Sequence, residues 1–151
     1  MSGLEKKLIT VIGKLVAHLK KEKLLPKGDV KILGVSALTS LDNEQVKKYY
    51  LRENVNELVT DFTYYAIENK LDGIVCSAGL EATIVKKKYK NLFIVCPGIR
   101  LPGDKADDQS RVVTPYEALI KNKVSGIVMG RSLVRGNIKN NIKRLIDHLN
   151  Q

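Results

Sequence analysis

The chain has 151 residues, of which 44% are hydrophobic, so it is long enough for one domain with a real core and too short for two ordinary ones. No run approaches the roughly 20 apolar residues of a membrane-spanning helix, and the lysine-punctuated N-terminus does not resemble a signal peptide. The net charge of +10 raises the possibility of nucleic-acid binding. However, the lysines are spread over predicted helix faces, and no aromatic side chains alternate with arginines as a stacking platform requires.

We therefore expect a single domain over residues 1–151, located in the cytoplasm, with neither a membrane nor a nucleic acid as partner. The two cysteines, Cys76 and Cys96, end apolar runs and lack metal-ligand spacing. We interpret both as small buried thiols in a protein of a reducing compartment.

Hydrophobic spacing predicts helices alternating with short apolar strands along the first two thirds of the chain. Asp42 and Gln45 form a capping-box pattern for the second helix, whose periodicity continues to Asn69. In chain order the predicted elements are a helix over 4–24, a strand over 30–38, a helix over 42–69, a strand over 72–77, a helix over 80–90 and a strand over 91–96.

The last third begins with a strong helix start. Thr114, Pro115 and Glu117 supply an N-cap, a proline in the first turn and a capping-box glutamate. A strand over 124–130 and a closing helix along Ile138–Leu149 follow. The strands are continuously apolar, which is typical of a parallel sheet covered by helices on both faces.

Small or polar residues follow each predicted strand, and the last two strands are each followed by an arginine, Arg100 in "PGIR" and Arg131 in "MGRS". In a (β/α)8 barrel this end of the strands carries the active site, and the loops after the last two strands commonly hold a phosphate. A guanidinium matches phosphate oxygens in a bidentate way, and Gly98, Gly103 and Gly130 would let the backbone approach an anion. The alternative is that the arginines pair with nearby aspartates: Asp104, Asp107 or Asp108.

The segment 97–113 is longer than the usual connection of about 4–6 residues, so it is a candidate functional loop. Together with its neighbours it resembles the bacterial orotidine 5'-phosphate decarboxylases. The matching stretches are "LGVSALTS" (33–40), "LDGIVCSAGLEA" (71–82), "FIVCPGIRLPGDKADDQSRVVTPYEAL" (93–119) and "GIVMGRSL" (126–133).

The resemblance implies an α/β fold, the C-terminal half, (β/α)4, of a TIM-type (β/α)8 barrel with parallel strands. It implies a lyase of pyrimidine (UMP) biosynthesis that needs no metal or organic cofactor. Thr39 matches the residue beside the pyrimidine, and the 5'-phosphate ligands match Arg100, Gln109, Gly130 and Arg131. Residues 97–113 match the loop that closes over the substrate.

The family's catalytic lysine and its flanking aspartates, arranged D-x-K-x-x-D, have no counterpart in this sequence. The closest Lys/Asp groupings, "KGDVK" (27–31) and "PGDKADD" (102–108), lack the spacing, so we assign no catalytic residue. The "SAGLEA" segment also has one residue more than the usual serine-to-glutamate step.

Three hypotheses for the function follow. The first is a decarboxylase half that binds orotidine 5'-phosphate or UMP and acts only when a separately encoded N-terminal half complements it. Because half a barrel leaves open sheet edges, we also expect that two copies associate or that a separate N-terminal half completes the barrel. The second is a non-catalytic remnant that binds nucleotide phosphate or has lost function. The third is a basic nucleic-acid binder, which the scattered lysines disfavour.

Overall fold

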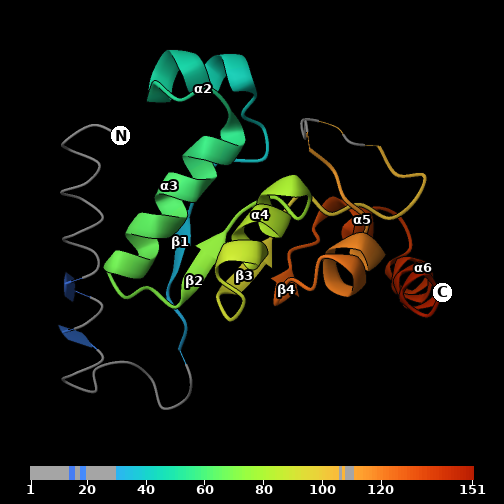
Figure 1. Cartoon of the computed structure of the whole chain (residues 1–151). Helices are drawn as coiled ribbons and strands as arrows, with labels where there is room; N and C mark the ends of the chain where they lie inside the picture. The colour runs from blue at the N-terminus through green and yellow to red at the C-terminus, as the bar shows by residue number, and fades with distance from the viewer. Residues whose placement is uncertain (1–13, 16–17, 20–29, 106, 108–110) are drawn as a thin grey trace.

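Four short parallel strands form one sheet in chain order (Figure 1). The computed structural model describes residues 14–15, 18–19, 30–105, 107 and 111–151, so most of the helix expected over 4–24 lies outside the described residues. The strands are β1 (Leu33–Val35), β2 (Gly73–Val75), β3 (Phe93–Cys96) and β4 (Gly126–Ile127). Each pairs in parallel with the next, which confirms the predicted α/β class.

Helices connect the strands and follow the last one. They are α2 (Asn43–Tyr50), α3 (Val55–Glu68), α4 (Leu80–Lys88), the π-helix η1 (Glu117–Lys121), α5 (Arg131–Val134) and α6 (Ile138–Leu149). The predicted start at Thr114 is confirmed, since the Glu117 amide donates to Oγ1 of Thr114 and the Glu117 carboxylate accepts from the Thr114 amide. Within the described residues no helix has the length and apolar character needed to cross a bilayer.

The single helix predicted over 42–69 is wrong, because the structure divides it into α2 and α3. The capping box of Asp42 and Gln45 is present at the start of α2. After Tyr50, however, Leu51 adopts a left-handed φ of 55°, and the Asn54 side chain caps α3 by accepting from the Glu57 amide at 3.0 Å. The apolar spacing in the sequence continues across this break, so it does not indicate that a second helix begins after Asn54.

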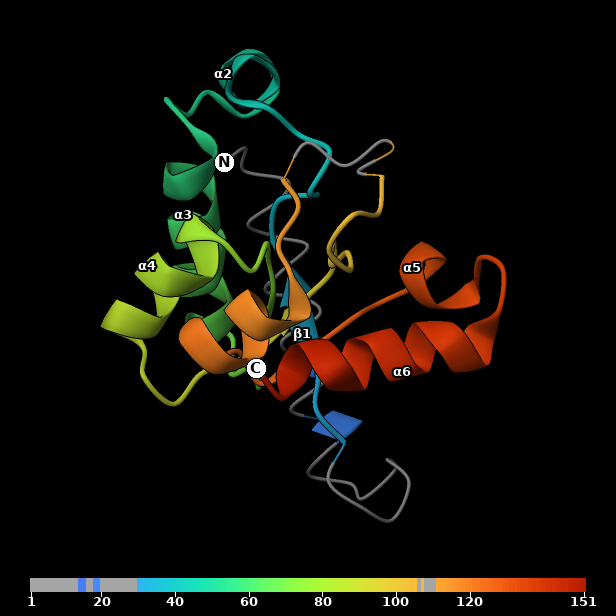
Figure 2. The ribbon, with the colours of Figure 1, turned by 90° about the vertical axis from the view of Figure 1, so that its right-hand side faces the viewer.

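The core lies between the sheet and the helices on one of its faces. Figure 2 shows α3 and α4 together on one side of β1. Ile74 and Ile94 are fully buried and belong to the same core cluster as Val59 and Ala66 of α3. On the opposite face Val35 is 59% exposed and Val128 is 53% exposed. The expectation of helices on both faces therefore fails for the described residues, whose one-sided cover is that of a barrel sector with helices outside.

Candidate functional site

The long segment after β3 returns to its own starting point. Ile99 forms a parallel bridge with Val113. The Arg100 amide donates to the Val113 carbonyl at 3.1 Å, and the Val113 amide donates to the Gly98 carbonyl at 3.4 Å. Gly98 makes the turn with a φ of 76°, in the region that favours glycine. The loop is therefore closed at its base, and Arg100 sits at that base.

The Arg100 side chain is buried, with 6% of its surface exposed. Its Nε donates to the Lys105 carbonyl at 3.3 Å, and its Nη1 donates to the Ile99 carbonyl at 3.0 Å. Its Nη2 is buried and has no hydrogen-bond partner among the described residues. A buried donor left unpaired costs about 1–3 kcal/mol, so this nitrogen is suited to donate to an acceptor other than the described residues.

The pairing of β3 with β4 brings Arg131 to the same place. The Val128 amide continues this pairing by donating to the Cys96 carbonyl at 2.9 Å, and the chain then reaches Gly130 and Arg131 at the start of α5. The Leu101 amide donates to Ser132 Oγ at 3.4 Å, which ties the loop to α5. The predicted placement of the two arginines after neighbouring parallel strands is confirmed.

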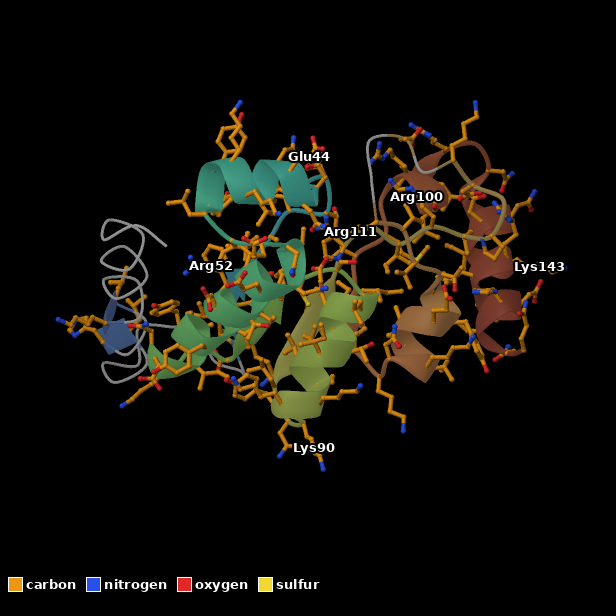
Figure 3. The ribbon with its side chains drawn as sticks, turned by 45° about the horizontal axis from the view of Figure 1, so that its top comes forward. Glu44, Arg52, Lys90, Arg100, Arg111 and Lys143 are labelled. Carbon is orange, nitrogen blue, oxygen red and sulfur yellow. The ribbon has the colours of Figure 1, made fainter. Side chains whose placement is uncertain are left out.

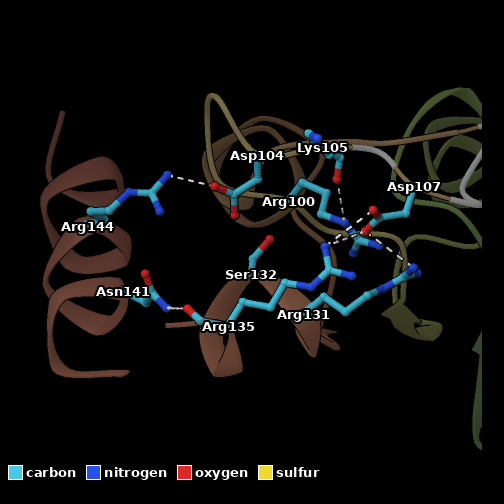
Figure 4. A pocket seen from close by; sticks show the side chains of 9 residues that line it. All are labelled: Arg100, Asp104, Lys105, Asp107, Arg131, Ser132, Arg135, Asn141 and Arg144. Atoms are coloured by element: carbon cyan, nitrogen blue, oxygen red, sulfur yellow. Dashed lines mark hydrogen bonds and ion pairs between the residues drawn. The ribbon is translucent and has the colours of Figure 1, made fainter. Parts of the chain in front are cut away.

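A charged cavity of about 140 Å³ lies between the loop, α5 and α6 (Figure 4). By the bulk-water share of about 30 Å³ per molecule it has room for a few waters or one small anion. It is lined by Arg100, Asp104, Lys105, Asp107, Arg131, Ser132, Arg135, Asn141 and Arg144.

Two aspartates hold these cations in place. Asp107 Oδ2 lies 3.3 Å from Arg131 Nη1 and 3.0 Å from Arg135 Nη1, so the predicted alternative of pairing with a loop aspartate also holds. Asp104 Oδ1 accepts from Arg144 Nη2 at 2.9 Å. Partial burial raises the pKa of Asp104, but hydrogen bonds from Arg144 and Ser132 outweigh it and keep the pKa below its ordinary value.

A second, more apolar hollow opens beside this cavity on the uncovered face of the sheet. Thr39, Arg100, Gly130 and Arg131 all line it, together with Val35, Val75 and Val128. The structure therefore brings together four of the five residues expected to bind substrate. The fifth, Gln109, lies outside the described residues.

Several cavity residues were missed by the sequence reasoning. Arg135 is one helical turn beyond Arg131, so helical spacing could have indicated it. Ser132 adjoins Arg131, whereas Asn141 and Arg144 come from α6 and carry no local signal, because only the tertiary fold places them beside the loop.

Lys31 and Asp72 lie near the strands, but at the ends of the strands opposite this site. Asp72 precedes β2 and accepts from the Ile32 amide at 2.7 Å, while the Lys31 ammonium lies 5.4 Å from the centre of the Phe93 ring. These are the amino ends of the strands, opposite the arginines. In the described part of the chain no cluster of three His, Cys, Asp or Glu side chains could hold a metal.

Comparison with known proteins places these features in a family. Residues 9–142 match the model of the orotidine 5'-phosphate decarboxylase / HUMPS family. The chain is 44% identical over 118 residues to the orotidine 5'-phosphate decarboxylase of Aquifex aeolicus, covering 75% of this chain and 49% of that protein. It is 37% identical over 136 residues to that of Coxiella burnetii, covering 89% of this chain and 54% of that protein.

Solved structures agree with this. An orotidine 5'-phosphate decarboxylase from Lactobacillus acidophilus superposes with a TM-score of 0.61 at 26% identity, covering 83% of this chain and 53% of that one. An uncharacterized conserved protein from Geobacillus kaustophilus also gives a TM-score of 0.61, at 27% identity, covering 83% of this chain and 52% of that one. The chain thus spans about half the length of the relatives it matches.

Proposed function

Because the chain belongs to the orotidine 5'-phosphate decarboxylase / HUMPS family, we propose that it supplies the phosphate-binding half of an orotidine 5'-phosphate decarboxylase site. The observation that carries the proposal is the convergence of Arg100 and Arg131 from neighbouring strands on one hollow. The buried Nη2 of Arg100, which has no hydrogen-bond partner among the residues that the structure describes, supports an anionic ligand there. Thr39, which lines the same hollow, would contact the base.

In this assignment the chain binds and orients the substrate, and a complementing half supplies the proton donor. Remote binding energy from the phosphate then supports the chemistry at the pyrimidine ring. Lys105 is the lysine that lines the charged cavity, and its backbone carbonyl is engaged by Arg100. A general acid must reach the atom that it protonates, and we assign that role to no residue of this chain.

The uncovered face supports the need for a complement. Exposed Val35 and Val128 lie on it, and β1 and β4 are the outer strands of the described sheet. Open strand edges and exposed apolar patches favour association. A second copy of the chain or a separate N-terminal half could cover this face, but only the separate half could also supply the proton donor. Sedimentation that gives a dispersed monomer at high concentration would contradict association between copies.

The activity test is recombination of halves. The chain is co-expressed with the N-terminal half of the Aquifex aeolicus relative, and decarboxylation of orotidine 5'-phosphate is followed spectrophotometrically. We expect turnover from the pair and none from the chain alone. Arg131→Ala should abolish the gain, and Lys87→Ala, which removes an equal charge from the exposed face of α4, should not.

A positive control is the same relative divided into its own two halves. If those halves recombine to an active enzyme and the hybrid pair remains inactive, the decarboxylase assignment is wrong. Phosphate binding without activity in that case would support the non-catalytic remnant.

A further inference from the structure

One carboxylate occupies the centre of the arginine cluster. Asp107 Oδ1 and Oδ2 accept from Arg135 Nη1 at 3.3 and 3.0 Å, and Oδ2 also lies 3.3 Å from Arg131 Nη1. The guanidinium of Arg100 lies beside them in the same cavity (Figure 4). The arrangement is that of an anion held by arginines, in which the anion belongs to the chain itself.

Cations outnumber carboxylates among the described residues of the cavity. These residues include four arginines, one lysine and two aspartates. Asp104 is held separately by Arg144, at 2.9 Å. Asp107 therefore pairs with Arg131 and Arg135, and Arg100 lies in the same lining. Within the described part of the chain, Nη2 of Arg100 has no hydrogen-bond partner, so a donor is left for a further acceptor.

A phosphate dianion would use the same donors as this carboxylate. Guanidinium groups bind carboxylate and phosphate oxygens in similar bidentate geometries. An incoming phosphate carries more charge and more acceptor oxygens, so it can engage Arg131 and the unpaired nitrogen of Arg100 together. It cannot do so while the carboxylate remains between the arginines, because two anions on one set of donors repel each other.

We propose that Asp107 is an internal competitor of the phosphate ligand, which fills the anion site of the unliganded chain and must leave Arg131 before phosphate binds. This inference rests on the proposed phosphate-binding function. It assigns Asp107 a regulatory role at that site, lowering its affinity for free inorganic phosphate while a nucleotide gains further contacts along the hollow toward Thr39.

The test compares inorganic phosphate binding by the native chain and by Asp107→Asn, using calorimetry. Asp107 has a φ of 57°, and asparagine tolerates this left-handed region, so the variant should keep the loop geometry. The ion pairs of Asp107 with Arg131 and Arg135 are partly exposed and therefore weak. Because phosphate does not have to displace them in the variant, we expect it to bind about tenfold more tightly. The matched control is Glu68→Gln, which removes the same charge at the exposed end of α3 and should leave the affinity unchanged.

A double variant shows whether the tighter phosphate binding depends on Arg131. The tightening should disappear in Asp107→Asn/Arg131→Ala, because the released donor is then missing. Thermal unfolding with and without phosphate gives a second readout, in which phosphate should raise the Tm of Asp107→Asn more than that of the native chain.

The outcomes separate the two claims. If native chain and Asp107→Asn bind phosphate equally, or if the variant binds more weakly, Asp107 is a structural anchor and the inference is wrong while the proposed function stands. If neither of them nor the control binds phosphate or UMP, the proposed function fails and the inference fails with it.

Discussion

The guanidinium of Arg111 lies against the buried carboxylate of Glu81, with 2.6 Å between Nε and Oε1. Its Nη2 also donates to the Leu38 carbonyl at 2.8 Å, and its Nη1 donates to the Leu41 carbonyl. The other oxygen of Glu81 accepts from the Ser77 amide at 3.0 Å. Arg111, in the segment after β3, thus contacts the loop after β1 directly and the loop after β2 through Glu81 of α4. Figure 3 shows where the Arg111 side chain lies.

Replacing Arg111 by alanine should destabilise the fold. It leaves the Glu81 carboxylate buried without its counter-ion and removes donors from two loop carbonyls. Breaking a buried ion pair costs about 3–5 kcal/mol, and since Arg111 is partly exposed we expect a loss of about 2–3 kcal/mol in the free energy of unfolding. Urea unfolding measures it. Arg52→Ala, which breaks the more exposed pair with Asp61, should cost under about 1 kcal/mol; equal losses would contradict the account.

The stability lost in Arg111→Ala should depend on pH. Burial raises the pKa of Glu81 above its ordinary value, although Arg111 and the Ser77 amide oppose the rise. The folded chain therefore holds this proton more tightly than the unfolded chain, and the contribution of Glu81 to stability falls as the pH rises from the ordinary glutamate range through the folded pKa. Without Arg111 the pKa rises further, so the loss should be small in acid and largest at neutral pH.

Unfolding free energies measured from about pH 4 to about pH 8 test this sign. In the double variant Glu81→Gln/Arg111→Ala the pH-dependent part should vanish, because no carboxyl remains to titrate. A loss from Arg111→Ala that is the same at every pH, or greatest in acid, would show that the Glu81 charge is not what Arg111 compensates.

Local signals predicted much of this fold, and tertiary contacts account for the rest. The capping box at Asp42 and the helix start at Thr114 were readable because each involves residues three apart. The pair of Arg111 with Glu81 was not, since it joins residues 30 positions apart and no periodicity records it. The break at Leu51 escaped notice because apolar spacing runs across it. Likewise, continuously apolar strands do not reveal which face remains uncovered.

Gly73 should tolerate no side chain. A Cβ added there would overlap the carbonyl oxygen of Phe93 on the neighbouring strand, whereas a Cβ added at Gly126 would meet Val95 Cγ2 at an ordinary 3.7 Å. Overpacking typically costs 1–3 kcal/mol and occasionally more, so Gly73→Ala should lower the unfolding free energy by about 3 kcal/mol and Gly126→Ala by under about 1 kcal/mol. Chemical denaturation compares them, and similar stabilities would contradict the strand pairing of β2 with β3.

The two thiols should be inert in the folded chain. Cys76 is 1% exposed and Cys96 is fully buried, and both are free. The neighbouring thiol of Cys96 and burial raise the pKa of Cys76 far above its ordinary value, so Cys76 offers no reactive thiolate. For Cys96, complete burial keeps a reagent away from the sulfur. A colorimetric thiol reagent at about pH 8 should label neither cysteine until urea unfolds the chain. Rapid labelling under native conditions would show that α4 does not cover this part of the sheet.

Phosphate binding by Arg100 and Arg131 can be measured directly by calorimetry with UMP on the native chain and on Arg131→Ala, with uridine as the ligand that lacks phosphate. Since the hollow is open to water, we expect UMP to bind the native chain at about millimolar affinity and uridine to bind more weakly. Arg131→Ala should weaken UMP binding about tenfold or more, since charge-assisted hydrogen bonds contribute about 1.5–3 kcal/mol, and leave uridine unaffected. Equal heats for UMP and uridine, or for UMP with native chain and variant, would contradict phosphate binding by these arginines.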